Sequence, residues 1–203
     1  MSLAVSPETI VERRRRLLRD EIRTIAVELF VANGFDAVTV DDIAEASGTS
    51  PRTFFRYFAS KDDIVLDLAR RLDDRLLAAV AGRPDAEGPI VALREAFRST
   101  SRVEPSDRDR VLALANILAE APLLRARAHG ERLEGGDRLV ALLVRRSPGH
   151  ISSRDLFVAA TAVTAVAGSE FYAWAESGGQ GDPSERICAA LAILESGLCA
   201  LDH

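Results

Sequence analysis

The sequence predicts an all-helical protein of about nine helices, arranged as a small three-helix domain followed by a larger helical domain. Apolar residues recur at intervals of three and four along the 203 residues, and no segment alternates as a β-strand does. Alanine, leucine, arginine and glutamate, all strong helix formers, dominate the composition, whereas aromatic residues make up 5%. We expect the domain boundary between residues 1–60 and 61–203.

Three helices are expected in the first domain, at residues 7–33, 40–47 and 51–58. The first begins near Pro7 or at the arginine run that follows it, and Gly34 is typical of the residue after a helix end. Thr39 and Ser50 are favourable N-caps for the other two helices. Pro51 would occupy the first position of the third helix, where its missing N–H costs nothing.

Six longer helices are expected in the second domain, between loops rich in glycine and proline. They are expected at about residues 61–81, 89–102, 106–120, 122–146, 153–177 and 183–201. Gly135 and Gly136 lie inside the helix at 122–146, where each glycine costs roughly 1 kcal/mol. We therefore expect a kink or a break in that helix.

Charge, cysteine and histidine usage exclude several classes of protein. The net charge of -5 excludes a protein that coats nucleic acid through its overall charge, so DNA binding requires a local patch. Cys188 and Cys199 have no partner at zinc-binding spacing, and we expect no metal and no cofactor. The histidines form no metal pair and no nucleophile–base pattern, so an all-helical enzyme is a disfavoured alternative.

Neither a membrane span nor a signal peptide is expected. The longest apolar stretch, residues 156–168, is shorter than the roughly 20 residues that a span needs. The first residues lack the charged and then apolar pattern of a signal peptide. These features predict a soluble, cytoplasmic protein.

Residues 39–58 have the pattern of a helix-turn-helix, two short helices joined by a three-residue turn that contains glycine. The small Ala44 would let the helices approach, and Gly48 can adopt the left-handed conformation that the turn requires. In the second helix, Phe54 and Phe58 would be buried, and Arg52 and Arg56 would share the opposite side. Residues 50–61 hold three bases and no acid. A guanidinium on such a helix can bind guanine in the major groove, which is worth about 1–3 kcal/mol of discrimination. The alternative is an amphipathic helix with solvated arginines.

Residues 39–61, and more loosely residues 18–66, resemble the N-terminal domain of the tetracycline-repressor (TetR) family of bacterial transcription regulators. The matching residues are Leu29, Phe30, Gly34, Phe35, Thr39, Ile43, Ala44, Gly48, Ser50, Thr53, Phe54, Phe55, Arg56, Tyr57, Phe58, Ser60 and Lys61. The resemblance implies a homodimeric repressor that binds a palindromic double-stranded DNA operator and is released by a small hydrophobic ligand. The alternative is an activator, or a regulator that needs no ligand, that binds DNA through the same helix-turn-helix.

The resemblance also implies roles for individual residues. Thr39 and Lys61 would hold phosphates, and Arg52 is the expected base contact. The remaining expected DNA contacts are Ser50, Pro51, Thr53, Phe55, Arg56 and Tyr57. Phe55 stands where the family usually has tyrosine, so a phosphate contact there would be lost or replaced by apolar packing. The arginine run at residues 13–16 is either an arm on the minor groove or DNA backbone, or a solvated helix start.

For the second domain the resemblance implies a ligand chamber and a dimer interface in the last two helices. The helix at 153–177 is apolar on all sides over much of its length, and such a helix must be covered on all sides. The expected interface residues are Ala160, Val163, Ala167, Leu191, Leu194 and Leu198; an intramolecular core is the alternative.

Ligand contacts are expected at Phe97, Asn116, Phe171 and Trp174, which could equally belong to the core. Similarity to the mycofactocin-regulator subgroup implies an acyl-coenzyme-A-like ligand, with arginines among Arg98, Arg102, Arg125 and Arg127 at the mouth of its tunnel.

Overall fold

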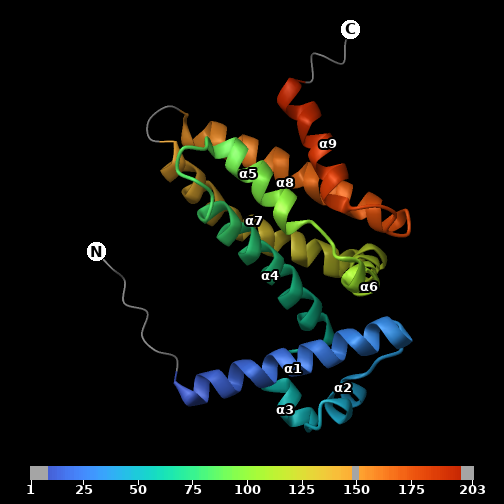
Figure 1. Ribbon diagram of the computed structural model, residues 1–203. Coiled ribbons are helices and arrows are strands. Elements are labelled where there is room, and N and C mark those ends of the chain that lie inside the picture. The colour runs from blue at the N-terminus through green and yellow to red at the C-terminus, as the bar shows by residue number, and fades with distance from the viewer. Residues whose placement is uncertain (1–8, 148–150, 198–203) are drawn as a thin grey trace. The chain divides into compact units, whose positions relative to one another are not determined.

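The computed structural model describes residues 9–147 and 151–197, without the side chains of 133–135, and the described residues form helices and no strand (Figure 1). The chain packs as two compact units, Met1–Val65 and Leu66–His203. The predicted all-helical fold is confirmed. The functional boundary expected after residue 60 stays a prediction.

The first unit contains α1 (Ile10–Asn33), α2 (Val40–Ala46), α3 (Pro51–Phe55) and the start of α4 (Lys61–Ala81). One apolar face of α1 is buried, with Ile22, Ala26 and Phe30 at its centre. Helix α2 contacts both α1 and α3, and Ile43 of α2 and Phe54 of α3 are fully buried as well. The three helices therefore share one small core, and their other faces are exposed.

Helix α3 is shorter than expected. It ends at Phe55 rather than at residue 58, because the backbone tightens into i to i−3 hydrogen bonds. The N–H of Arg56 donates to the carbonyl of Thr53 at 3.1 Å, and the N–H of Tyr57 to that of Phe54 at 2.8 Å. This tight turn still brings Phe58 back to the core, where it is 1% exposed.

The second unit contains the rest of α4 and all later helices. These are α5 (Pro89–Thr100), the short 3-10 helix η1 (Pro105–Asp107), α6 (Arg108–Glu120), α7 (Pro122–Arg146), α8 (Ser153–Glu176) and α9 (Pro183–Ser196). Packing is most extensive between α8 and α9, followed by α5 with α9 and α7 with α8. The helix expected at 106–120 begins with the 3-10 turn η1. Helix α7 is continuous, without the break expected at Gly135 and Gly136.

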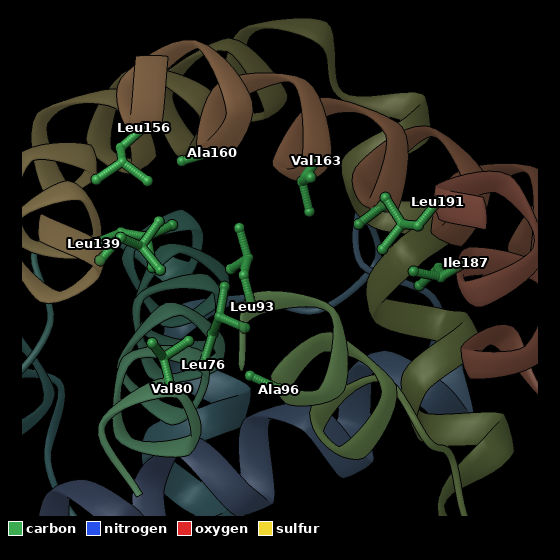
Figure 2. Packing of buried hydrophobic residues seen from close by; sticks show 12 residues of the cluster. Leu76, Val80, Leu93, Ala96, Leu139, Leu156, Ala160, Val163, Ile187 and Leu191 are labelled. Atoms are coloured by element: carbon green, nitrogen blue, oxygen red, sulfur yellow. The ribbon is translucent and has the colours of Figure 1, made fainter. Parts of the chain in front are cut away.

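The main core of this unit lies between α8 and the helices that face it (Figure 2). Leu156, Ala160 and Val163 of α8 point toward Leu139 of α7 and Leu93 of α5. A smaller cluster joins α6 to the C-terminal end of α8 around the fully buried Trp174. The indole N–H of Trp174 donates to the carbonyl of Gly181 at 3.0 Å and so ties α8 to the turn that leads into α9.

Helix α8 as a whole is long and apolar enough to cross a membrane, judged by length and composition alone. Its uninterrupted apolar stretch, residues 156–168, is shorter than a membrane span. It is the one such helix among the described residues. One face of α8 accounts for part of this apolar character, because it forms the core of the unit. Its opposite face is exposed and remains apolar.

Candidate nucleic-acid interface

The N-terminus of α2 is closed by a capping box between Thr39 and Asp42. The Thr39 hydroxyl donates to the Asp42 carboxylate at 2.6 Å and accepts from the Asp42 N–H at 3.2 Å. The Thr39 N–H donates to the same carboxylate at 2.8 Å. These bonds hold the pKa of Asp42 below its ordinary value, the hydroxyl contributing most. The expected phosphate contact of Thr39 stays a prediction, and the carboxylate bonded to its hydroxyl opposes it.

The turn between α2 and α3 sets the direction of the recognition helix. Gly48 has a φ of +62°, the left-handed region in which glycine has no steric penalty. The N–H of Thr49 then reaches back to the carbonyl of Ala44 at 2.8 Å. Ala44 is 1% exposed, as expected for a small residue where two helices approach.

The side chain of Ser50 starts α3 by accepting a hydrogen bond from the N–H of Thr53 at 3.1 Å. Pro51 follows in the first helical turn. Phe54 is fully buried and lies 5.9 Å from Phe58 between ring centroids. The expected division of this helix into a buried phenylalanine face and an exposed basic face is therefore present.

The exposed face of α3 and the turn after it presents two arginines and two aromatic rings. Arg52 is exposed and makes no hydrogen bond or ion pair with the residues that the structure describes. The Arg56 guanidinium donates to the Tyr57 hydroxyl at 3.3 Å and lies 5.1 Å from the centroid of that ring. Phe55 is 57% exposed, although it touches Phe54 edge-on. A basic surface with an apolar ring can contact both a DNA backbone and a base edge.

Lys61 is placed differently from the expected phosphate contact. Its ammonium donates to the carbonyls of Phe35, Asp36 and Val38 at 2.7, 3.3 and 2.9 Å. It also lies 4.5 Å from the centroid of the Phe35 ring. All three N–H donors of the ammonium are therefore used within the protein, and Lys61 anchors the segment between α1 and α2.

Sequence reasoning missed this role of Lys61 and the contact between Arg19 and Phe58, whose ring centroid is 5.0 Å from the guanidinium carbon. Both contacts join residues far apart in the chain. No local spacing signals them, because the acceptors of Lys61 are main-chain carbonyls, which every residue carries.

Three of the residues expected to contact the ligand pack within the core clusters of the second unit, and their role as ligand contacts stays a prediction. Trp174 is buried and its N–H is satisfied, and Phe171 packs against it at 5.5 Å between ring centroids. Phe97 is half-buried against the main core. Asn116 is exposed, so it is not the buried amide that its apolar neighbours suggested.

Four residues expected at the dimer interface belong to the intramolecular core. Ala160, Val163, Ala167 and Leu191 are at most 9% exposed within a single chain, so they offer almost no surface to a second copy. Leu194 is half-buried against the same core. Leu198, like Cys199, lies outside the described residues. The intramolecular alternative therefore holds for these four residues, because the facing helices already cover them.

Among the described residues, no group of three or more histidine, cysteine, aspartate or glutamate side chains could hold a metal ion. Cys188 is half-buried, and burial raises the pKa of its thiol.

Comparison with known proteins agrees with this geometry. Residues 22–68 match the family model of bacterial regulatory proteins of the tetR family, and residues 87–199 match the MftR C-terminal domain. The transcriptional regulator TcmR of Streptomyces glaucescens is 34% identical over 178 residues, which cover 82% of this chain and 78% of TcmR. MftR of Mycobacterium tuberculosis, named for mycofactocin biosynthesis, is 30% identical over 97% of this chain and 98% of its own.

A solved structure extends the comparison. FadR of Thermus thermophilus, a TetR-family repressor in complex with lauroyl-CoA, has a TM-score of 0.62 and 27% identity, covering 88% of this chain and 94% of FadR. The two family models together cover most of both units. The chain is therefore a member of the TetR family of bacterial transcriptional regulators, a DNA-binding regulator with a C-terminal domain of the MftR type and not an enzyme.

Proposed function

We propose that this protein is a homodimeric repressor that binds a palindromic operator and is released from it by a small hydrophobic effector. The observation that carries the proposal is the surface of α3 and the residue after it. Arg52 and Arg56 are exposed there, on the side opposite the buried Phe54 and Phe58. A rigid basic helix of this kind fits the major groove. Cytoplasmic location, where the operator would lie, is part of the proposal.

Within this proposal Arg52 reads a base, since its guanidinium has no other partner among the described residues. Arg56 and Tyr57 reach the flanking backbone as a pair. Ser50, Pro51 and Thr53 lie along the groove, and Phe55 packs against a sugar or a thymine methyl group. Two-fold symmetry would place the two recognition helices roughly 34–36 Å apart, or somewhat more, on successive turns of the duplex.

The second copy would cover the exposed faces of α8 and α9. Val158, Ala162 and Ala165 lie on one side of α8, opposite the buried residues, and are exposed. On α9, Ala192 and Ile193 are exposed as well. Both faces combine small and apolar residues, so a symmetric contact between two chains would bury them closely.

The proposed effector is an acyl-coenzyme A. The support comes from the Thermus thermophilus relative, whose structure contains lauroyl-CoA. Release works as a shift of population, because the effector would favour a conformation in which the two recognition helices no longer fit the operator. About 1.4 kcal/mol of differential binding lowers operator affinity tenfold.

The test of DNA reading compares two double variants on the protein's own promoter DNA by fluorescence anisotropy. Arg52→Ala with Arg56→Ala should lose roughly 2–4 kcal/mol of specific binding. The matched control, Arg110→Ala with Arg154→Ala, removes two exposed arginines of the second unit and should bind as the wild type does. Equal affinity of both double variants would remove the assignment of these residues.

Effector release is tested by titrating the protein–DNA complex with lauroyl-CoA, with lauric acid and with coenzyme A alone. The proposal expects release by lauroyl-CoA and little effect of either half at the same concentration. Failure of all three to release DNA would refute the acyl-coenzyme A effector and leave the DNA reading intact.

Deletion of the gene distinguishes repression from activation. A rise in the transcript of the neighbouring operon supports the repressor, and a fall supports the activator. The second outcome has a precedent in the 72-residue match, at 36% identity, to a protein named as the transcriptional activator FasR of Mycolicibacterium smegmatis.

A further inference from the structure

The first two turns of α1 project from the core of their unit. Residues 10–17, here called the spur, are all exposed, and Ile22 is the first fully buried residue of the helix. A capping box between Thr9 and Glu12 starts the helix, so the spur is helical although all of its residues are exposed. The spur also precedes residue 22, at which the match to the family model begins.

The charge of this segment is opposite to that of the whole chain. Residues 10–19 carry five arginines and one glutamate, whereas the protein has a net charge of -5. The guanidinium groups of Arg13, Arg14 and Arg15 form no hydrogen bond or ion pair with the described residues. A concentrated positive charge of this kind attracts polyanions.

The helix dipole does not explain Arg13, Arg14 and Arg15. The N-terminus of a helix is the positive end of its dipole, where cations are unfavourable and anions favourable. Arg15 and Arg19 also stand four residues apart, a spacing at which like charges repel. A bound anion beside the spur would reverse both effects.

The spur lies in the same compact unit as the recognition helix. The Arg19 guanidinium sits over the ring of Phe58, three residues beyond the end of α3. Arg15 is one helical turn before Arg19 and shares its face of α1. The contact of Arg19 therefore joins the helix that carries the spur to the segment that follows α3.

We propose that the spur is a second DNA-binding element, whose arginines bind phosphates that flank the sequence read by α3. An α-helix with its side chains is about 10–12 Å across, and the minor groove is about 6 Å wide. A helical spur thus binds the outside of the backbone and does not enter the minor groove. The inference rests on the proposed DNA reading and adds contacts to it.

The test uses the triple variant Arg13→Gln, Arg14→Gln, Arg15→Gln in the full-length protein. Glutamine keeps helix propensity close to that of arginine and removes only the charge. The control replaces Arg75, Arg110 and Arg154, three exposed arginines of the second unit, by glutamine. Operator affinity is measured against salt concentration, and contacted phosphates are mapped by ethylation interference.

We expect the spur variant to bind the operator about tenfold or more weakly at low salt. Its slope of log affinity against log salt should be smaller by roughly 0.9 for each phosphate lost, so by about 1.8 when each of two protomers loses one. Ethylation-sensitive phosphates outside the half-sites should disappear, while discrimination between operator and random DNA is retained. The triple change to lysine should restore the slope, because a phosphate needs only the charge.

A spur variant with the slope and the ethylation pattern of the control would overturn the inference. The inference would also be overturned if operator affinity depended on A·T-rich flanking sequence and the triple change to lysine did not restore it. That result would indicate insertion of the arginines into the minor groove. Absence of DNA binding by the wild type would instead refute the proposed function. The two failures are therefore distinguishable.

Discussion

Lys61 links the helix-turn-helix to the end of α1 through main-chain carbonyls. Its compact ammonium points three donors at three carbonyls between Phe35 and Val38. Thr39, the N-cap of α2, follows Val38 directly. The ammonium therefore positions the start of α2, and we expect it to influence DNA binding only through the shape of this unit.

Two variants distinguish positioning from phosphate binding by Lys61. Lys61→Met should lower the free energy of unfolding of the N-terminal unit by roughly 2 kcal/mol, because two part-buried carbonyls and one exposed carbonyl lose a charged donor. It should weaken operator binding without changing the salt slope.

Lys61→Arg should rescue little of this loss, since a planar guanidinium cannot converge on three carbonyls as an ammonium does. A slope smaller by about 0.9 in the Met variant, with rescue by arginine, would instead assign Lys61 to a phosphate.

Asp42 gives a pH-dependent prediction. Its folded pKa lies below the ordinary value of 3.8, so its stabilising effect is present above that pH and is lost as pH falls through the folded pKa. Thr39→Val removes the hydroxyl that contributes most and should raise the pKa of Asp42 toward its ordinary value. Carboxyl NMR titration measures this shift.

Glu87 serves as the internal reference in that titration. Its pKa is lowered by Arg83 in the second unit, so it should not move in the Thr39 variant. An unchanged Asp42 pKa would contradict the capping box.

At the scale of the secondary-structure elements, the turn between α8 and α9 approaches α6 closely. Gly179 has a φ of +70°, and a Cβ added there would lie 2.8 Å from both terminal methyl carbons of Leu112. Leu112 belongs to the cluster around Trp174, which joins α6 to this turn. The missing side chain of Gly179 therefore lets α6 pack against the turn.

Gly179→Ala should lower the free energy of unfolding by more than Gly181→Ala. Gly181 has a φ of +73° with no atom within 4 Å of the added Cβ. Both substitutions place alanine in the left-handed region, at a cost of about 1–2 kcal/mol. The difference, measured by chemical denaturation, is the cost of displacing Leu112. Equal losses would mean that Leu112 moves aside freely.

At the scale of the whole molecule, the exposed apolar faces of α8 and α9 predict that two copies form a dimer through these helices. Val158 and Ile193 are 56% and 47% exposed, and the opposite faces of α8 and α9 belong to the core. A face of this composition on a helix that must be covered is typical of an interface between subunits.

Val158→Asp with Ile193→Asp should give a monomer by analytical ultracentrifugation at concentrations where the wild type is a dimer. Operator affinity should fall at least tenfold, because the two recognition helices lose their linkage. Leu123→Asp is the control, since Leu123 is the most exposed large apolar residue in the part of the chain that the structure describes, and it lies on α7. A double variant that stays dimeric would place the interface elsewhere.

The helices and the helix-turn-helix were predictable because their signals are local. Thr39 and Ser50 cap helices through hydrogen bonds to residues three positions away, and Pro51 starts a helix through its own fixed backbone angle. Gly48 adopts the expected left-handed conformation because it has no Cβ, which is again a local property. The periodicity of phenylalanines and arginines in α3 likewise needs only the geometry of one helix.

Long-range packing settled the rest. The pattern of α8 shows that the helix is apolar, but only the facing helices show that Ala160 and Val163 are covered and Val158 is not. Asn116 is exposed despite its apolar neighbours, and Lys61 binds carbonyls 23–26 residues away. Which face of a helix meets another segment depends on contacts between residues far apart in the chain. Such contacts produce no local sequence pattern from which they could be predicted.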